Sequence, residues 1–280
     1  MSRFHTLAAP VEISGIGLHC GFPVRVRLLP CETAGFAFVR RDLPGAPRVR
    51  ARLENIAATT HATVLCENEA TVSTTEHLLA ALWSQGVTHC DIELDAPEVP
   101  ILDGSAAPWC EAISRVGRRE IAGARATLEL IQPVWFDGGA AQILAVPSED
   151  FRISLAVDFD FPHLAPQTWS GTITAENFAR ELAPARTFTL EPWLQPLRDA
   201  GLIKGGSLEN AVVFFSDGPS SSARMPNEQA RHKALDAVGD FALLWGENDF
   251  RGHFFLFKAG HGAHREWMKK CLSSGFLARR

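Results

Sequence analysis

Short segments of alternating or β-branched residues open the chain and indicate strands. Segments of this kind, separated by glycine- and proline-containing turns, are PVRVRL, GFAFVR and ATVLC. A helix is expected from about Thr74 to Gln85, followed by the strand HCDIELD and a second helix from about Ser105 to Val116. The first half therefore combines early strands with later helices.

The same order of elements recurs in the second half. Strands are expected in TLELIQPVWF, QILAVP and FRISLAVDF, before a helix from Asn227 to Trp245, the strand HFFLFKA and a closing helix from about His264. A helical insert, ENFARELAPAR continuing into EPWLQPLRDAG, interrupts this half. The hydrophobic pattern thus predicts two α+β halves.

The polar, glycine-containing segment GRREIAGARA interrupts both the helical and the strand patterns. It covers residues 117–126 and is the expected joint between an N-terminal domain, residues 1–120, and a C-terminal domain, residues 126–280. If the two domains pack face to face, residues from both can meet in the cleft between them, which is a usual place for a ligand site.

Composition narrows the class of protein. Of 280 residues, 46% are hydrophobic, which suffices for a sizeable core, and 27 basic against 32 acidic residues give no field for nucleic-acid binding. A small-molecule partner is therefore expected. The six cysteines form no CxxC pair, the N-terminus lacks the apolar core of a secretion signal, and no segment reaches the ~18 apolar residues of a membrane span. These features predict a cytoplasmic protein.

The segment RHKALDAVGD carries a possible metal site. On a helix, the four-residue spacing of His232 and Asp236 places both side chains on one face. Far upstream, STTEHLLAAL offers His77 as a third ligand, with Glu76 beside it. Structural zinc is normally closed by four protein groups, whereas three ligands leave a position for water or substrate. The arrangement predicts a catalytic zinc and a metal-dependent hydrolase.

Each of these residues also has a purely structural explanation. Ser73 to Glu76 fits a capping box, in which Glu76 would bond back to the helix N-terminus. His77 is equally explained as a hydrogen-bonded histidine at a helix start. His232 and Asp236 are also consistent with an i,i+4 pair on a solvated helix face.

Two further residues have alternatives of the same kind. His261 lies in KAGHGAH, where flanking glycines allow close backbone approach, but a loop histidine in water would look the same. Thr187, in ARTF, would either supply a hydroxyl to an oxyanion or cap the following turn.

Several segments together resemble one enzyme family. They are GIGLHCG, STTEHLLAAL, APEVPILDGSAAPW, APARTF with GGSLENAVV, and RHKALDAVGD followed by KAGH. Their order and joint occurrence resemble the UDP-3-O-acyl-N-acetylglucosamine deacetylase family over nearly the whole chain. The resemblance implies an α+β fold of two similar domains, each a small mixed sheet packed against helices, with inserts that form a passage for an acyl chain and the active site in the interdomain cleft.

The resemblance also assigns roles to individual residues. It implies zinc (Zn²⁺) ligands at His77, His232 and Asp236. Chemistry is implied for four more residues, namely Glu76 as general base, His261 as general acid, Asp240 as the group that positions His261, and Thr187 facing the oxyanion. Substrate contact is implied for Lys233, Phe188, Lys258 near the diphosphate, and Phe159 near the uridine.

The resulting expectation is a zinc-dependent deacetylase. It would remove the N-acetyl group from an acylated UDP-sugar during lipid A biosynthesis in the cytoplasm, without an obligatory protein partner. Two alternatives stay open. One is another zinc hydrolase, such as an amidase or deaminase, and the other is a non-catalytic module that binds sugar nucleotides or lipids.

Overall fold

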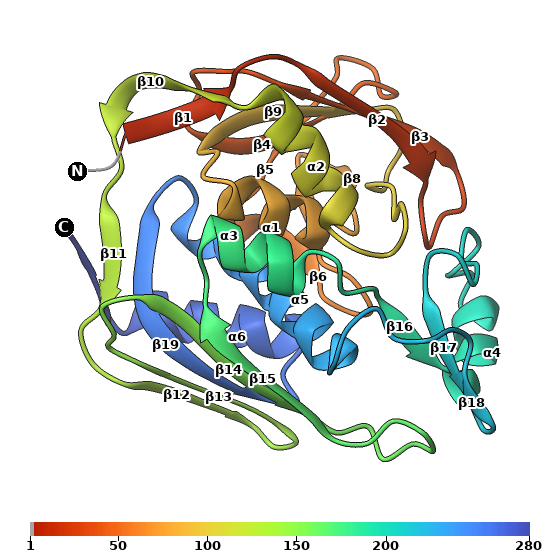
Figure 1. The fold of residues 1–280 in the computed structure, drawn as a ribbon. Helices are drawn as coiled ribbons and strands as arrows, with labels where there is room; N and C mark the ends of the chain where they lie inside the picture. The colour runs from red at the N-terminus through yellow and green to blue at the C-terminus, as the bar shows by residue number, and fades with distance from the viewer. Residues whose placement is uncertain (1–2) are drawn as a thin grey trace.

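Two seven-stranded mixed sheets built on the same plan organise the chain. The computed structural model describes residues 3–280. In Figure 1 the two sheets form the outer layers, with helices between them. The first sheet contains β1 (Arg3–Leu7), β2 (Val11–Ile16), β3 (Pro23–Leu29), β4 (Gly35–Arg40), β5 (Arg48–Arg50), β9 (His89–Leu94) and β10 (Arg118–Ala124). The second contains β11 (Thr127–Leu130), β12 (Val134–Gly138), β13 (Ala141–Val146), β14 (Phe151–Val157), β15 (Gln167–Thr172), β19 (Asp249–Phe257) and β20 (Leu277–Arg279).

The pairing of strands shows that the second half repeats the first. In the first sheet β9 runs parallel to β1 and β4 and antiparallel to β3. In the second sheet β19 runs parallel to β11 and β14 and antiparallel to β13. The edge pairs β1–β10 and β11–β20 also correspond, and both are antiparallel. The predicted α+β fold of two similar halves with mixed sheets is confirmed.

Four helices fill the space between the sheets, namely α1 (Glu76–Ser84), α2 (Ala107–Val116), α5 (Glu228–Trp245) and α6 (His261–Ser273). Every residue of α1 is buried, including Glu76 and His77. A helix that is buried on all faces belongs to the interior, which explains why EHLLAALWS lacks a polar face. Helix α1 packs against α5, so the two halves contribute one central helix each.

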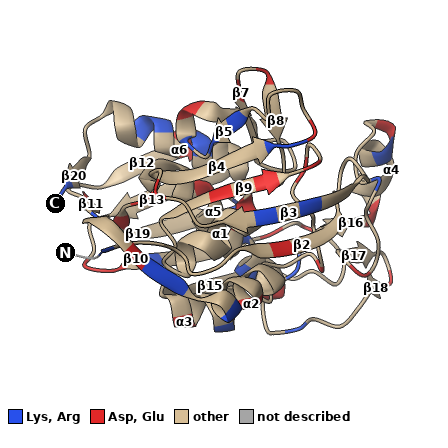
Figure 2. Ribbon diagram, turned by 90° about the horizontal axis from the view of Figure 1, so that it is seen from above, with Lys and Arg blue, Asp and Glu red and all other residues tan. Residues whose placement is uncertain are grey.

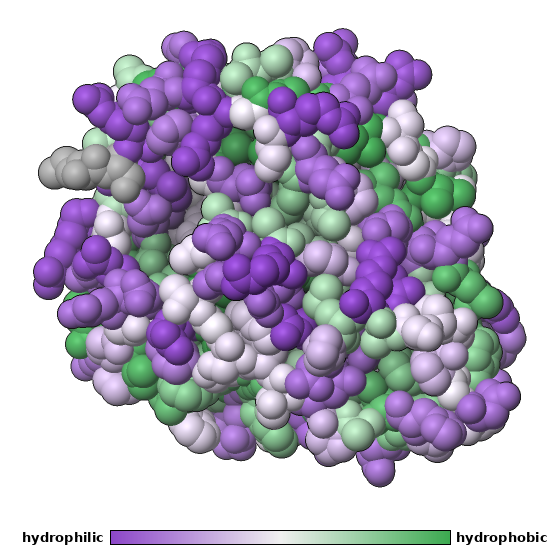
Figure 3. All heavy atoms as spheres, in the orientation of Figure 1, coloured by the Kyte–Doolittle hydropathy of each residue, from purple (hydrophilic) through white to green (hydrophobic). Residues whose placement is uncertain are grey.

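Each half carries an insert between its fifth strand and its central helix. The first contains η1 (Leu53–Asn55), β6 (Ile56–Ala58), β7 (Val64–Glu67) and β8 (Ala70–Val72). The second contains α3 (Ala175–Asn177), η2 (Phe178–Leu182), β16 (Phe188–Leu190), α4 (Glu191–Asp199), β17 (Val212–Phe215) and β18 (Gly218–Pro219). Part of the second insert forms the right side of Figure 1, where hydrophobic residues reach the surface in Figure 3.

Several sequence-based boundaries are wrong, and the segment TLELIQPVWF, expected as one strand, forms the two strands β11 and β12. The segment expected to be an irregular joint contains β10, which extends the first sheet through Ala124. Only Ile121 of this edge strand is buried, so it lacks the apolar alternation that marks a strand. Helix α6 begins at His261 rather than His264, and β19 begins at Asp249. The proposed division into residues 1–120 and 126–280 stays a prediction.

The outer faces of the two sheets differ in chemistry. Figure 2 shows charged residues along β2, β3 and β9, and Arg27 lies 2.8 Å from Glu93 there. The second sheet instead exposes Trp135, Phe255 and Phe257. No helix within residues 3–280 is long and apolar enough to cross a membrane.

Candidate metal centre and active site

The packing of α1 against α5 brings three possible metal ligands together. His77 Nε2 lies 3.4 Å from Asp236 Oδ1, and His232 Nε2 lies 3.5 Å from the same oxygen. The rings of His77 and His232 are 5.0 Å apart and meet edge to face. All three residues are buried, which contradicts the alternative of an i,i+4 pair on a solvated helix face.

The donor atoms fit a bound cation. Ligands about 2.0–2.1 Å from a tetrahedral ion lie roughly 3.4 Å apart, which matches both distances to Asp236 Oδ1. That oxygen is buried and has no hydrogen-bond partner among the described residues. His232 Nδ1 donates to Ala185 O at 3.0 Å, and burial lowers the pKa of His232 to about 4. The imidazole is therefore neutral at pH 7, with its Nε2 lone pair directed to the site.

Lys233 lies beside this triad. Its ammonium donates to Asp236 Oδ2 at 2.8 Å, so the two oxygens of Asp236 have different surroundings. Burial lowers the pKa of Lys233, but the Asp236 carboxylate outweighs burial and raises it overall. The same ammonium lies 5.8 Å from the centre of the Phe188 ring. Lys233 therefore lies between the triad and the Phe188 ring.

Glu76 directs its carboxylate into the site. It is the first residue of α1, the N-cap Thr75 makes no side-chain cap bond, and Glu76 Oε2 instead accepts a hydrogen bond from the Thr63 backbone at 3.2 Å. The capping-box explanation is therefore wrong. Burial raises the pKa of Glu76, while His261 and His77 oppose this shift. A buried carboxylate with raised proton affinity is suited to accept a proton.

His261 faces Glu76 from the other side. Its Nε2 lies 3.9 Å from Glu76 Oε1, and its Nδ1 lies 2.7 Å from Asp240 Oδ2. Burial alone lowers the pKa of His261, but the Asp240 carboxylate and then Glu76 raise it to about 9. The imidazole therefore carries a proton at neutral pH. His261 is buried at the start of α6, so the alternative of a loop histidine in water is wrong.

A close backbone contact holds Thr187 in place beside the site. Its N–H donates to Gly104 O at 2.7 Å. Gly104 has φ +83°, and a Cβ there would lie 2.2 Å from Asn210 O, so the turn in LDGSAAP requires glycine. Thr187 precedes β16, and the N-cap of the next helix, α4, is Leu190. Thr187 is therefore not the N-cap of α4.

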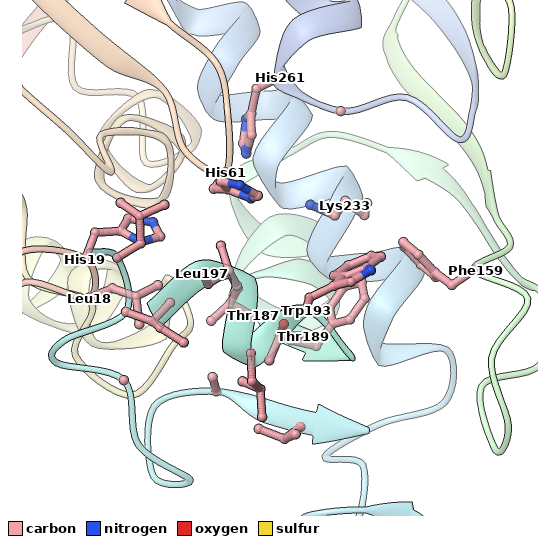
Figure 4. A pocket seen from close by; sticks show the side chains of 18 of the residues that line it. Leu18, His19, His61, Phe159, Thr187, Thr189, Trp193, Leu197, Lys233 and His261 are labelled. Carbon is pink, nitrogen blue, oxygen red and sulfur yellow. The ribbon is translucent and has the colours of Figure 1, made fainter. Parts of the chain in front are cut away.

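A cavity of about 1050 Å³ opens beside these groups and is large enough for a sizeable ligand. Figure 4 shows Thr187, Lys233 and His261 around it. One wall is aromatic, since Phe159 lies 5.1 Å from Phe188 and 6.3 Å from Trp193 between ring centres.

The rest of the lining combines apolar and basic groups. Leu194, Leu197 and Leu202 line the cavity. Lys258 also lines it and pairs with Asp158 at 2.9 Å.

Sequence reasoning missed several groups in or near the site. His19 and His61 line the cavity, and Thr63 and His264 contact Asp240. One signal was available, because His264 follows His261 by three residues, which is about one helical turn. No local pattern points to Thr63, whose contact with Asp240 spans 177 positions.

Comparison with known proteins identifies the family of the chain. The model of the LpxC family, UDP-3-O-acyl N-acetylglycosamine deacetylase, matches residues 4–273. The chain belongs to this family. A UDP-3-O-acyl-N-acetylglucosamine deacetylase from a Nostoc species is 41% identical over 276 residues, covering 96% of this chain and 98% of the relative. Proteins with the same name from Solibacter usitatus and Syntrophotalea carbinolica are 40% and 38% identical, over 94% and 96% of this chain and 89% and 87% of their own length.

Membership in the LpxC family confirms the resemblance stated from the sequence. The match extends across both halves, so it includes α1 and α5 together with the cavity between β16 and α6. The buried triad of His77, His232 and Asp236 is a group that could hold a metal ion. The roles of individual side chains are inferred below.

Proposed function

We propose that this protein hydrolyses the N-acetyl group of UDP-3-O-acyl-N-acetylglucosamine and releases acetate. Family membership supports the substrate, since its relatives carry that name. The observation that carries the chemistry is Asp236 Oδ1, which lies between two imidazoles and has no hydrogen-bond partner in residues 3–280. Glu76 and His261 lie beside it, 3.9 Å apart. By the same reasoning the product enters lipid A biosynthesis, and the reaction takes place in the cytoplasm.

His77, His232 and Asp236 would hold the metal, for which zinc is our proposal. Two imidazole nitrogens and one carboxylate oxygen are typical ligands of catalytic zinc. A zinc ion there would lower the pKa of water from about 15.7 toward ~7 and polarise the acetyl carbonyl.

Glu76 and His261 would carry the two proton transfers. Glu76 takes a proton from the attacking water, because its buried carboxylate has a raised pKa. His261 then donates its Nε2 proton to the glucosamine nitrogen as the C–N bond breaks, so the products are the free amine and acetate. Asp240 holds His261 through Nδ1 and stabilises its protonated form.

Three further groups would stabilise charge and hold the substrate. The Thr187 hydroxyl is proposed to donate to the developing oxyanion, a contact worth about 2.7–4 kcal/mol in comparable sites. Lys233 adds positive charge beside the reacting centre. Lys258 lines the cavity and is proposed to contact the diphosphate.

The aromatic and apolar walls would separate the two ends of the substrate. Phe159 is proposed to contact the uridine, and Phe188 the sugar or the start of the acyl chain. Leu194, Leu197 and Leu202 offer an apolar surface for the rest of that chain. Burial of one methylene contributes about 0.8 kcal/mol, so a long acyl chain would add substantially to affinity.

The test measures acetate released from UDP-3-O-acyl-N-acetylglucosamine by purified protein, with and without a chelator. We expect chelator-sensitive release that returns when zinc is added back and that falls when UDP competes. Absence of release despite bound metal would exclude this function. Release that UDP does not inhibit would indicate a zinc hydrolase with another substrate.

A further inference from the structure

His264 binds the same carboxylate oxygen as the proposed acid. Its Nδ1 lies 2.7 Å from Asp240 Oδ2, as does the Nδ1 of His261. An ionised carboxylate only accepts hydrogen bonds, so both imidazoles donate Nδ1–H to one oxygen. The other oxygen, Oδ1, accepts from the Thr63 hydroxyl at 2.5 Å. Asp240 therefore has three donors, two of which lie one turn apart on α6.

The surroundings of His264 place its hydrogen-bonding N–H on Nδ1. The side chain is fully buried, its ring lies 5.1 Å from the Phe241 ring, and Nε2 has no hydrogen-bond partner within the described part of the chain. A proton on Nε2 would bury an N–H without an acceptor, which is costly. His264 therefore donates from Nδ1 to Asp240.

We propose that His264 is a positioning residue for the acid step, because its Nδ1–H holds the Asp240 carboxylate in place and takes up part of its negative charge. The inference rests on the proposed role of His261. Each donor on this oxygen stabilises the ionised carboxylate and reduces the negative charge that it presents to the other donor. Loss of the His264 donor therefore strengthens the bond from Asp240 to His261, and His261 keeps its proton to higher pH.

Other ionisable groups face His261 and also affect its pKa. They are Asp240 and Asp236 from α5, Glu76 from α1 and His264 from α6, while His61 and Lys233 line the same cavity. Asp240 and Glu76 are close enough to His261 to favour its charged form. A change at His264 leaves these other groups in place, so its effect on the pH profile can be isolated.

Two substitutions separate hydrogen bonding from packing. His264→Leu fills the apolar pocket but removes the donor, whereas the side-chain amide of His264→Asn can place an N–H near the position of Nδ1. We expect the basic limb of the kcat profile to move upward by roughly half a pH unit or more in His264→Leu. In His264→Asn it stays at the wild-type position. His253→Leu, on the outer face of β19, controls for the loss of a histidine.

A shift in His264→Leu that His264→Asn reverses supports the proposal. An unmoved limb in folded, metal-loaded His264→Leu overturns it, as does an equal shift in both variants. NMR of zinc-loaded protein with ¹⁵N-labelled histidine answers the question without activity, even if His264→Leu does not fold. His264 should carry a proton on Nδ1 that is hydrogen-bonded to Asp240. A His264 whose Nδ1 carries no proton contradicts the proposal, whereas missing acetate release would count only against the proposed function.

Discussion

Gly239 of α5 lies against the backbone of Glu76 at the start of α1. A Cβ at Gly239 would lie 2.0 Å from the Glu76 carbonyl oxygen, so the two helices can approach this closely only because position 239 carries no side chain. The contact fixes Glu76 relative to the helix that carries His232 and Asp236. Site geometry therefore depends on a residue that has no functional group.

Gly239→Ala should destabilise the protein and disturb the metal site. The new methyl group meets backbone rather than a flexible side chain. We therefore expect the free energy of unfolding, measured by urea denaturation, to fall by about 1–3 kcal/mol. Gly262→Ala is the matched control, because its Cβ would meet only Thr59 Oγ1 at 3.6 Å. Equal stability of the two variants would contradict the proposed role of the close approach.

Asp236→Asn should lose the metal, whereas Asp240→Asn should keep it. The two aspartates lie one turn apart on α5, but only Asp236 offers an oxygen to the triad. After dialysis we expect about one metal ion per chain in Asp240→Asn and far less in Asp236→Asn. Loss of a group that hydrogen-bonds a metal ligand lowers metal affinity about 10–100-fold, so loss of a ligand itself should lower the affinity further. Metal analysis of both proteins decides, and full occupancy in Asp236→Asn would remove that residue from the ligand set.

His261→Ala should abolish the basic limb of the pH profile. The pKa of His261 is raised to about 9, so its proton is present at neutral pH and is lost as pH rises through that value. Wild-type kcat should therefore fall above about pH 9, although the limb belongs to the coupled site. The variant should retain metal but turn over about 10²–10⁴-fold more slowly, with no decline of this kind. A persistent basic limb in His261→Ala would assign it to another group.

Arg186→Met tests the buried ion pair at the start of α5. Glu228 is fully buried and accepts from Arg186 Nε at 2.8 Å, so removing the guanidinium leaves a buried carboxylate without its partner. Loss of one partner in such a pair costs about 3–5 kcal/mol. Arg180→Met is the control, because Arg180 pairs with Glu176 at the exposed surface and its loss should change stability little. Urea denaturation of both variants makes the comparison, and similar midpoints would show that the Arg186–Glu228 pair contributes little.

Helix α5, which carries His232 and Asp236, could be predicted because its evidence lies within one short segment of the sequence. The four-residue spacing of His232 and Asp236 fixes their common face once the helix forms. The second half could be recognised as a repeat because its strand and helix order follows the hydrophobic pattern of the first. The strand β10 was missed because only Ile121 in it is buried.

Contacts across the fold could not be read from such patterns. His77 reaches Asp236 only after α1 packs on α5. The sequence offered His77 as a third ligand and the family resemblance assigned it that role, but no local pattern fixes the meeting of the two helices. Nothing near Thr63 in the sequence indicates its bond to Asp240. Glu76 shows that a local pattern can also fit a role that the structure does not realise, since its sequence fits a capping box but its carboxylate lies in the site.

Anomalous X-ray diffraction at the zinc absorption edge, from crystals of the zinc-loaded protein, tests the central claim most directly. We predict one strong peak about 2.0–2.1 Å from the Nε2 atoms of His77 and His232 and about 2.0–2.2 Å from Asp236 Oδ1, with the remaining position not filled by protein. A peak elsewhere, or a fourth protein ligand at this ion, would contradict a catalytic metal centre between α1 and α5.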